Sequence, residues 1–552
     1  MKASLKHITG WLAVLILLNW ASYHVYERFD FTSDQRFTLS ETSQGLINSI
    51  DQPMSITVFL KGDMNGEFKR LQRETQYLLE ELNIKNPLIR FEFINPVGEK
   101  DNPQQVGNAF YQNGMMPENL SVMKNGKLTK TIIFPWAVVK YKGQQIPVHL
   151  LNKTLNADVE NMINASVQNL EYAFADAILK LSRERRKKIA VIRSKGELED
   201  RYLTDFLSSV SDYYLIAPFS LDSVQSHPKK VLKELHKFDA IIEAKPTEAF
   251  TDKEVYVLDQ YIMQGGKALW MLESVAIEKD SLKQTGSNIA FPRDLNLLNL
   301  LFKYGVRINY ELINDVYSAP IYLTTGDAEN TQLNPYPWFY EPLAEPLNNH
   351  PIVSNINAVK FEFTNTIDTL KNDINKTILL KSSKLSRAEG TPREISLEQI
   401  NTKPNPEMYP QGGYPLAVLL EGEFTSAYKN RIKPFDYSNH KDKGKVTQQI
   451  VISDGDIAKN EIQKGKPLSL GFDRFTGETY GNKTFLINTL NYLLGDENLV
   501  KLRNKQINIP TLNAEKVEAE SLFWQVFNIG VGVVLIIGFG VFILWFRKLR
   551  MR

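Results

Sequence analysis

The sequence predicts an α/β protein with two folding units, flanked by one membrane-spanning helix at each end. Three observations support this prediction. Apolar runs without charge stand near both termini, strands and helices alternate from Ile189 onward, and a strand–helix–strand order followed by a hairpin comes before that residue. A chain of 552 residues, 43 % of them hydrophobic, has enough apolar material for buried cores of this kind.

The first predicted span covers residues 8–26, which contain no Asp, Glu, Lys or Arg and follow a short N-terminus, residues 1–7. Nineteen residues of helix match the thickness of a bilayer core, about 30 Å. A cleaved signal peptide is the alternative, but Trp20 and Tyr23 stand where a small-residue cleavage site would be needed. We therefore expect an uncleaved anchor.

The second predicted span covers residues 523–546 and is followed by a basic tail, residues 547–552. Positive residues flanking a span remain in the cytoplasm, so both termini are expected there and the bulk of the chain outside. The span also holds Gly530, Gly532, Gly538 and Gly540. Small residues allow close helix packing, so these glycines are candidate contacts with a partner helix; ordinary composition of spanning helices is the other interpretation.

The first folding unit is expected over residues 35–185. Residues 55–60 and 88–94 are strand candidates with an amphipathic helix between them, Asn125-Gly126 indicates a hairpin, and a long helix follows near 157–181. This order resembles a thioredoxin-like layout. The chain has no cysteine, so the layout would serve as a scaffold or binding surface without redox chemistry.

The second folding unit is expected over residues 189–495, with an irregular insertion at about 305–410 and a linker at 496–520. Short apolar runs alternate with helical stretches, as in a doubly wound parallel sheet. The first four runs are residues 189–193, 214–217, 240–243 and 268–272, and residues 415–420 and 449–452 are candidates for further strands.

The sequence contains little that predicts catalysis. It has no phosphate-binding GxxxxGK[ST], no HExxH, no GxSxG elbow and no Cys nucleophile. The chain has 65 Lys and Arg residues and 63 Asp and Glu residues, so its net charge is +2. A charge this small gives no general electrostatic attraction to nucleic acid. We therefore expect no enzyme activity, no catalytic residues, no cofactor, no metal and no nucleic-acid partner.

Two segments are candidate ligand or partner sites. Asp454 and Asp456 come directly after an apolar strand, and ligands bind at the carboxyl ends of strands in open α/β sheets. The same carboxylates are also favoured in turns and helix caps, so both interpretations stay open. Asp473 and Arg474 stand in a glycine-rich loop before the last globular helix, where loop geometry alone is the competing explanation.

An aromatic segment in the insertion is a candidate interaction surface. Its aromatic residues are Tyr336, Trp338, Phe339 and Tyr340, interspersed with prolines. An exposed segment of this composition is typical of recognition surfaces. A buried loop that wedges into a core is an equally good interpretation.

Several strings together resemble the GldG family, the gliding-motility-associated auxiliary components of ABC transporters. They are NPYPWFYEPL at 334–343, LAVLLEGEFTS at 416–426, YKNRI at 428–432, VISDGD at 451–456 and the segment 471–507. The resemblance covers nearly the whole chain. It implies a substrate-binding-type subunit in the inner membrane, with its bulk in the periplasm and with GldF-like permease and GldA-like ATPase partners as well as membrane lipid. It also implies an amidotransferase-like second unit without its catalytic Cys.

Two other functions remain open at this point. The first is a membrane-anchored scaffold of a motility or secretion machine without ligand binding. The second is a degenerate hydrolase of the cell envelope.

Overall fold

The structure is a computed structural model. It describes residues 38–62, 64–98, 102–124, 127–153, 158–183, 187–325, 332–346, 350–401, 403–409, 411–495 and 514–550, with Trp11, Val14, Leu15, Asn19 and Leu502. The predicted first span, residues 8–26, lies outside the described residues apart from four positions. The chain divides into two compact units, residues 1–506 and 507–552.

A four-stranded sheet forms the first part of the larger unit. Its order is β2-β1-β5-β6, with β1 and β2 parallel and the other neighbours antiparallel. The strands are β1 (Met54–Val58), β2 (Ile89–Phe93), β5 (Trp136–Tyr141) and β6 (Gln144–His149). The other elements are α2 (Glu41–Asn48), α3 (Gly66–Lys85), α4 (Pro103–Gln112), the paired β3 (Glu118–Lys124) and β4 (Lys127–Ile133), and α5 (Val159–Ser182). The predicted βαβ, hairpin and helix order is present here.

Local sequence explains the two long helices of this region. The side chains of Asn65 and Asp158 accept backbone N–H groups at the starts of α3 and α5, as N-cap residues do. In α3, Phe68, Leu71 and Leu79 recur at helical spacing and are buried. Each helix therefore turns one apolar face towards the core.

A seven-stranded sheet forms the centre of the larger unit, in the order β20-β23-β24-β10-β9-β7-β8. The five strands from β24 to β8 are parallel, whereas β23 and β20 run antiparallel to them. The strands are β7 (Lys188–Ile192), β8 (Leu215–Phe219), β9 (Ala240–Ala244), β10 (Lys267–Met271), β20 (Asn375–Lys381), β23 (Pro415–Thr425) and β24 (Lys443–Ile452). The predicted parallel sheet is confirmed, with two antiparallel strands added at one edge.

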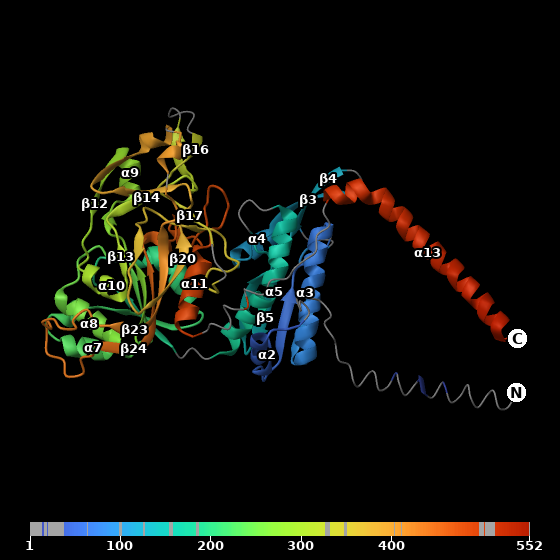
Figure 1. Ribbon diagram of the computed structural model, residues 1–552, viewed down its shortest axis with the longest axis horizontal. Helices are drawn as coiled ribbons and strands as arrows, with labels where there is room; N and C mark the ends of the chain where they lie inside the picture. Colours follow the sequence, from blue (N-terminus) through green and yellow to red (C-terminus); the bar gives the residue numbers. More distant parts are fainter. Residues whose placement is uncertain are drawn as a thin grey trace. The chain divides into compact units, whose positions relative to one another are not determined.

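Helices cover both faces of this sheet (Figure 1). One face packs on α6 (Asp200–Ser211) and α11 (Asn482–Leu493), and the other on α7 (Pro228–Leu235), α8 (Asp252–Met263) and α10 (Leu298–Tyr304). Successive strand residues point to opposite faces, so Ile241 packs towards α8 while Ile242 packs towards α6. Both faces are buried, which explains why the strands are continuously apolar.

The insertion at 305–410 is more ordered than its sequence predicts. It contains short antiparallel strand pairs and also β20, which belongs to the central sheet. The pairs within it are β13 (Val306–Ile308) with β19 (Ile367–Thr369), β14 (Glu311–Asp315) with β21 (Ser386–Gly390), β15 (Ile321–Thr325) with β16 (Gln332–Tyr336), and β17 (Leu343–Ala344) with β18 (Val359–Lys360). Just before the insertion stand β11 (Val275–Ala276), α9 (Lys279–Thr285) and β12 (Ser287–Pro292), and β12 pairs with both β11 and β22 (Arg393–Ser396). Strands such as β13 and β14 escaped prediction because their partners are distant in sequence, whereas β15 and β16 are close in sequence and were missed as well.

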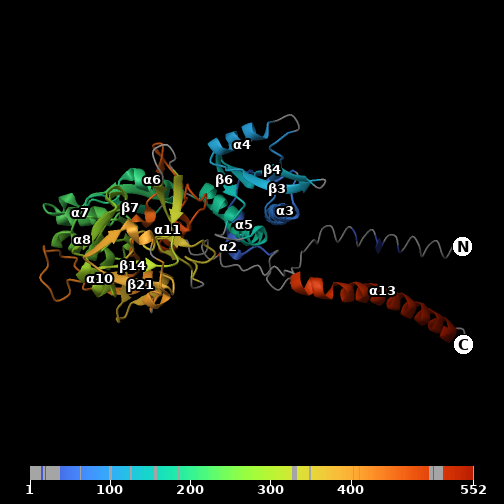
Figure 2. The ribbon, with the colours of Figure 1, turned by 90° about the horizontal axis from the view of Figure 1, so that it is seen from above.

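The second unit contains one long helix, α13 (Ala514–Arg550), visible at full length in Figure 2. Its segment Ala519–Arg550 is long and apolar enough to cross a membrane, with a mean hydropathy of 2.7 and no burial in its apolar window. The predicted apolar C-terminal helix is confirmed. The predicted linker at 496–520 ends earlier than expected, because Ala514 to Glu520 are already helical.

Candidate functional site

Three neighbouring strands bring charged side chains together at one edge of the central sheet. Lys245 directly follows β9, Glu273 stands two residues after β10, and Asp454 and Asp456 follow β24. The three strands are adjacent and parallel, so their carboxyl ends meet at the same edge. Open α/β sheets bind their ligands at this edge.

Lys245 is the centre of a buried ion network. Its Nζ lies 3.6 Å from Glu273 Oε1 and 3.0 Å from Glu278 Oε1. It also contacts Asp456 Oδ2. Burial by itself would lower the pKa of Lys245, but the three carboxylates outweigh burial and raise it. Lys245 is therefore protonated at neutral pH, and its charge holds the ends of β9, β10 and β24 together.

The backbone at Lys245 adopts an uncommon conformation that depends on Gly455. The φ angle of Lys245 is 56°, in the left-handed region that side chains such as lysine rarely adopt. A Cβ at Gly455 would lie 2.6 Å from Lys245 Cβ. Only glycine therefore lets the turn after β24 approach Lys245 this closely.

Three carboxylates of the network have the spacing of a cation site. Glu273, Asp454 and Asp456 are buried, and each offers an oxygen within 4.8 Å of the others. The Lys245 ammonium already contacts two of them, so a metal ion would have to displace it. Asp454 accepts the backbone N–H groups of Glu362 and Asp456, both at 2.7 Å, and burial raises its pKa well above the usual value. We assign these carboxylates to the ion network.

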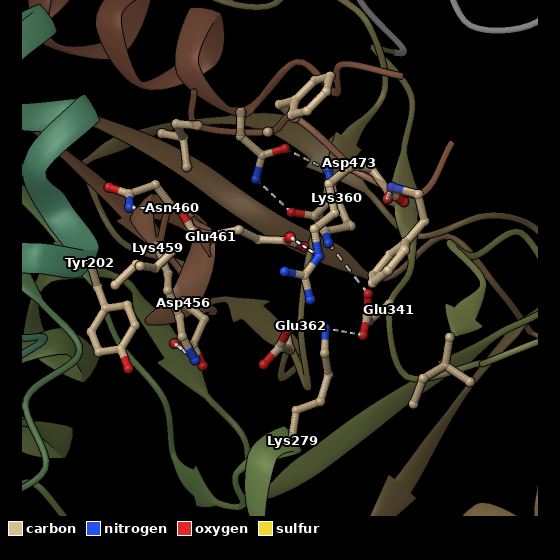
Figure 3. A pocket seen from close by; sticks show the side chains of 18 of the residues that line it. Tyr202, Lys279, Glu341, Lys360, Glu362, Asp456, Lys459, Asn460, Glu461 and Asp473 are labelled. Carbon is tan, nitrogen blue, oxygen red and sulfur yellow. Dashed lines mark hydrogen bonds and ion pairs between the residues drawn. The ribbon is translucent and has the colours of Figure 1, made fainter. Parts of the chain in front are cut away.

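A cavity of about 410 Å³ opens beside the network (Figure 3). Lys279 projects into it, with Nζ 2.5 Å from Glu341 Oε1 and 2.7 Å from Glu362 Oε2. Lys360 Nζ lies 3.5 Å from Glu341 Oε2. Burial opposes both charges of the Lys279–Glu362 pair, yet opposite charges nearby raise the pKa of Lys279 and lower that of Glu362. The volume is within the usual range for ligand pockets, about 300–1,000 Å³.

The cavity wall carries equal numbers of basic and acidic side chains. The basic ones are Arg201, Lys279, Lys283, Lys360, Lys459 and Arg474, and the acidic ones are Asp280, Glu341, Glu362, Asp456, Glu461 and Asp473. Aromatic rings also line it, and the rings of Tyr322 and Phe475 stack with centroids 4.5 Å apart. Because its charges balance, this wall suits a polar ligand of no net charge better than a polyanion.

The structure brings the four predicted candidate residues close together. Asp456, Asp473 and Arg474 line the cavity, and Asp454 lies buried behind Asp456. Arg474 Nε is 3.5 Å from Glu461 Oε2. Asp454 and Asp473 also accept backbone N–H groups two residues further on, so they shape turns as well. The same segments thus line the cavity, as a candidate ligand site would, and form turns, as the alternative interpretation expected.

The aromatic segment of the insertion is a buried wedge and not an exposed surface. Trp338, Phe339 and Tyr340 keep 1 %, 8 % and 1 % of their surface exposed, and Tyr336 is half-buried on β16. Trp338 and Tyr340 pack with β11 and β14 in a small separate core. Burying the large apolar area of these rings stabilises the fold more than leaving them in contact with water, so the segment packs into the core instead of forming an exposed surface.

The glycines of α13 are spread around the helix. Each residue advances by about 100°, so Gly538 and Gly540 lie about 80° from Gly530 on either side, and Gly532 lies nearly opposite Gly530. A Cβ at any of them would meet nothing within 4 Å. Their role in packing against a partner stays a prediction.

Sequence reasoning missed most of the ion network. Lys245 and Glu273 stand after apolar strands, so the strand-end rule applied to every strand would have found them. Lys279, Glu341 and Glu362 come from α9 and from segments flanking β17 and β18. No local pattern marks these three residues.

Comparisons with known proteins agree with parts of this description. A family model described as "ABC-type uncharacterized transport system" matches residues 186–489, and a model described as a domain of unknown function (DUF7088) matches residues 33–140. A Borreliella burgdorferi protein described as "Uncharacterized protein" is 20 % identical over 411 residues, which cover 73 % of this chain and 74 % of that protein.

A solved structure titled "mmIFT52 N-terminal domain" aligns with a TM-score of 0.32 and 15 % identity, covering 56 % of this chain and 97 % of the other. The family match at 186–489 spans more than half of the chain and includes the central sheet and every residue of the cavity. The chain belongs to the family of auxiliary components of ABC-type transport systems.

Proposed function

We propose that this protein is a non-enzymatic, substrate-binding-type subunit of an ABC transporter linked to gliding motility. Its membership of the ABC auxiliary family supports the transporter part of the proposal. The link to motility, and to GldF-like permease and GldA-like ATPase partners, rests on the resemblance of segments such as 334–343 and 451–456 to GldG-like proteins.

The proposed location is the inner membrane, with both termini in the cytoplasm and the bulk of the chain in the periplasm. The apolar helix α13 supports anchoring, and the basic residues that follow it support a cytoplasmic C-terminus. The order β2-β1-β5-β6 supports a thioredoxin-like first unit, and the parallel order from β24 to β8 supports an amidotransferase-like second one.

The cavity at the carboxyl edge of the central sheet carries the binding part of the proposal. It combines a ligand-sized volume with charged groups of both signs and stacked aromatic rings. A polar ligand that is neutral or carries both charges can replace ion pairs within the wall by its own. For instance, an acidic group of the ligand can take the place of Glu341 beside Lys279.

The side chains around the cavity support a non-enzymatic role. The described wall contains no Ser, Thr, Cys or His. Lys245 stands in a strained turn directly after a strand, where α/β hydrolases hold their nucleophile. Three carboxylates keep its amine protonated, and a protonated amine is neither a nucleophile nor a base. Purified residues 35–510 should also show no ATP hydrolysis, because the sequence has no phosphate-binding GxxxxGK[ST] loop; turnover that a point change in this fragment abolishes would contradict this.

Ligand binding can be tested on the full chain purified in detergent from its own membranes. Small molecules released on denaturation are identified by mass spectrometry for the wild type, for Tyr322→Ala in the cavity and for Leu333→Ala, whose half-exposed side chain lies outside it. A compound that accompanies the wild type and Leu333→Ala but is lost from Tyr322→Ala supports the proposal. Equal recovery from all three proteins argues against it.

A scaffold without ligand binding is the second candidate function. One observation favours it: Lys279, Lys360, Lys459 and Arg474 all have carboxylates within 4.0 Å, so the wall satisfies its own charges. If no compound accompanies the wild type while the permease still co-purifies, this alternative is preferred.

A further inference from the structure

The connection between β23 and β24 ends in a basic, exposed tip. The tip is the run Lys429–Lys433, KNRIK, and all five residues are exposed. Ile432 keeps 94 % of its surface accessible. Lys429, Arg431 and Lys433 have no carboxylate within ion-pair distance among the described residues. An apolar side chain thus stands fully exposed among three positive charges that form no direct ion pair, although Lys429 and Lys433 are close enough to Asp442 to help lower the pKa of its carboxyl.

The base of this connection is fixed to α8. Ser426 Oγ donates to Asp259 Oδ2 at 2.6 Å, and Lys441 N donates to Gln260 Oε1 at 2.8 Å. The ring of Tyr256 packs between neighbouring rings of the same connection. Because both ends of the loop are held, the tip is presented to solvent in a defined position.

The tip projects from the edge of the sheet opposite the cavity. β24 pairs with β10 only over Gln449–Ile452, whereas its pairing with β23 reaches back to Lys443. The first residues of β24 therefore form a two-stranded arm that extends past β10. In Figures 1 and 2 the orange connection lies at this end of the sheet, near α8.

We propose that the tip Lys429–Lys433 docks onto the anionic lipid surface of the membrane that α13 spans. Basic residues are attracted to anionic headgroups, and an exposed aliphatic side chain gains by entering the interface. The tip offers both at once. The inference depends on membrane anchoring by α13 and is independent of whether the cavity binds a ligand.

Docking through the tip would place the cavity away from the lipid. β24 has 10 residues, and the cavity residues follow its far end. At about 3.4 Å per residue, the cavity edge would stand roughly 34 Å further from the lipid than the start of β24. The cavity would then open towards the space beyond the membrane surface.

The test uses the full chain in lipid nanodiscs. Because the chain has no cysteine, Ile432→Cys provides a unique site for an apolar fluorophore, and Gln463→Cys on the exposed hairpin after β24 provides the matched control. Quenching by nitroxide-labelled lipids is compared in discs of phosphatidylcholine alone and discs containing 30 mol % phosphatidylglycerol, a fraction of order one third chosen to give a strongly anionic surface.

Docking predicts strong quenching at residue 432 in anionic discs and little in neutral ones, with residue 463 unquenched in both. Each basic residue strengthens such binding about fivefold, so Lys429→Gln/Arg431→Gln/Lys433→Gln should weaken docking about 100-fold. Lys464→Gln/Lys466→Gln, on the control hairpin, should change it less than about twofold. Equal, low quenching at 432 and 463 in anionic discs overturns the proposal. Cross-linking of residue 432 to another protein in whole membranes, without lipid quenching, would instead identify an acidic protein partner and also overturn it.

Discussion

Replacement of Lys245 by methionine should destabilise the central sheet strongly. The change leaves Glu273 and Asp456 without the ammonium that lies 3.6 Å from the first and in contact with the second. Removal of one partner from a buried ion pair typically costs about 3–5 kcal/mol, because the remaining charge stays buried without compensation. A unit of about 300 residues unfolds with an entropy change of about 0.6 kcal/mol per kelvin, so this loss corresponds to a decrease in Tm of roughly 5–8 °C.

The pH dependence of this loss distinguishes an ion network from simple packing. Burial already raises the pKa of Glu273 well above its usual value, and removal of Lys245 raises it further. A carboxyl whose pKa is raised on folding destabilises the protein above its unfolded pKa, about 4.5, and this cost falls as the pH is lowered. The Tm difference between Lys245→Met and the wild type should therefore be largest near pH 8 and smaller near pH 5.

The assay is thermal unfolding of the full chain in detergent, followed by circular dichroism at pH 5 and pH 8. Lys229→Met, at an exposed position of α7, is the control and should lie within about 0.5 kcal/mol of the wild type. Adding Glu273→Gln to Lys245→Met should restore at least about 1 kcal/mol, since it removes one of the stranded charges. A Tm decrease below about 2 °C, or one equal at both pH values, would refute the reasoning.

Three further predictions concern other parts of the chain. A reporter active only outside the cytoplasm should be active near Gly390 and silent after Arg552, and the reverse result would contradict the proposed topology. Gly532→Leu and Gly538→Leu should each lower the permease recovered with the protein several-fold, because leucine prevents close helix approach; recovery at wild-type levels by both would place the contact outside α13. Burial lowers the pKa of His149 to about 4, so protonation of its ring destabilises the fold by up to about 3.4 kcal/mol as the pH falls from 6.5 to 4, a cost that is absent above pH 6.5. His149→Gln should flatten this part of the Tm–pH curve, and an unchanged curve would exclude His149 as its source.

The parallel part of the fold could be predicted because its signals are local. Residues 240–243 and 268–272 are apolar runs bounded by helical stretches, and both became neighbouring parallel strands. The insertion gave no such signal. Glu311–Asp315 pairs with Ser386–Gly390, some 75 residues away, and pairing over that separation leaves no periodicity in either segment.

The site was predicted only as far as single segments reveal it. Asp454 and Asp456 were found because two carboxylates after a strand are conspicuous. Lys245 was missed because one lysine after an apolar run is usually a solvated strand end. Its role depends on Glu273 and Glu278 after β10 and on Asp456 after β24, and only the assembled sheet brings these two segments to Lys245.

The continuity of α13 has a mechanical consequence. At 1.5 Å per residue its 37 residues extend about 55 Å, whereas the bilayer core takes up about 30 Å. In the proposed topology, the helical turns before Phe523 would extend beyond the outer face of the bilayer as a stiff lever. A tilt of about 10° within the bilayer, well inside the range seen for spanning helices, would swing the far end of the helix by roughly 10 Å. If the permease contacts α13 as proposed, a tilt of this helix would move the start of the chain that connects it to the folded domains, without any contact between the permease and those domains.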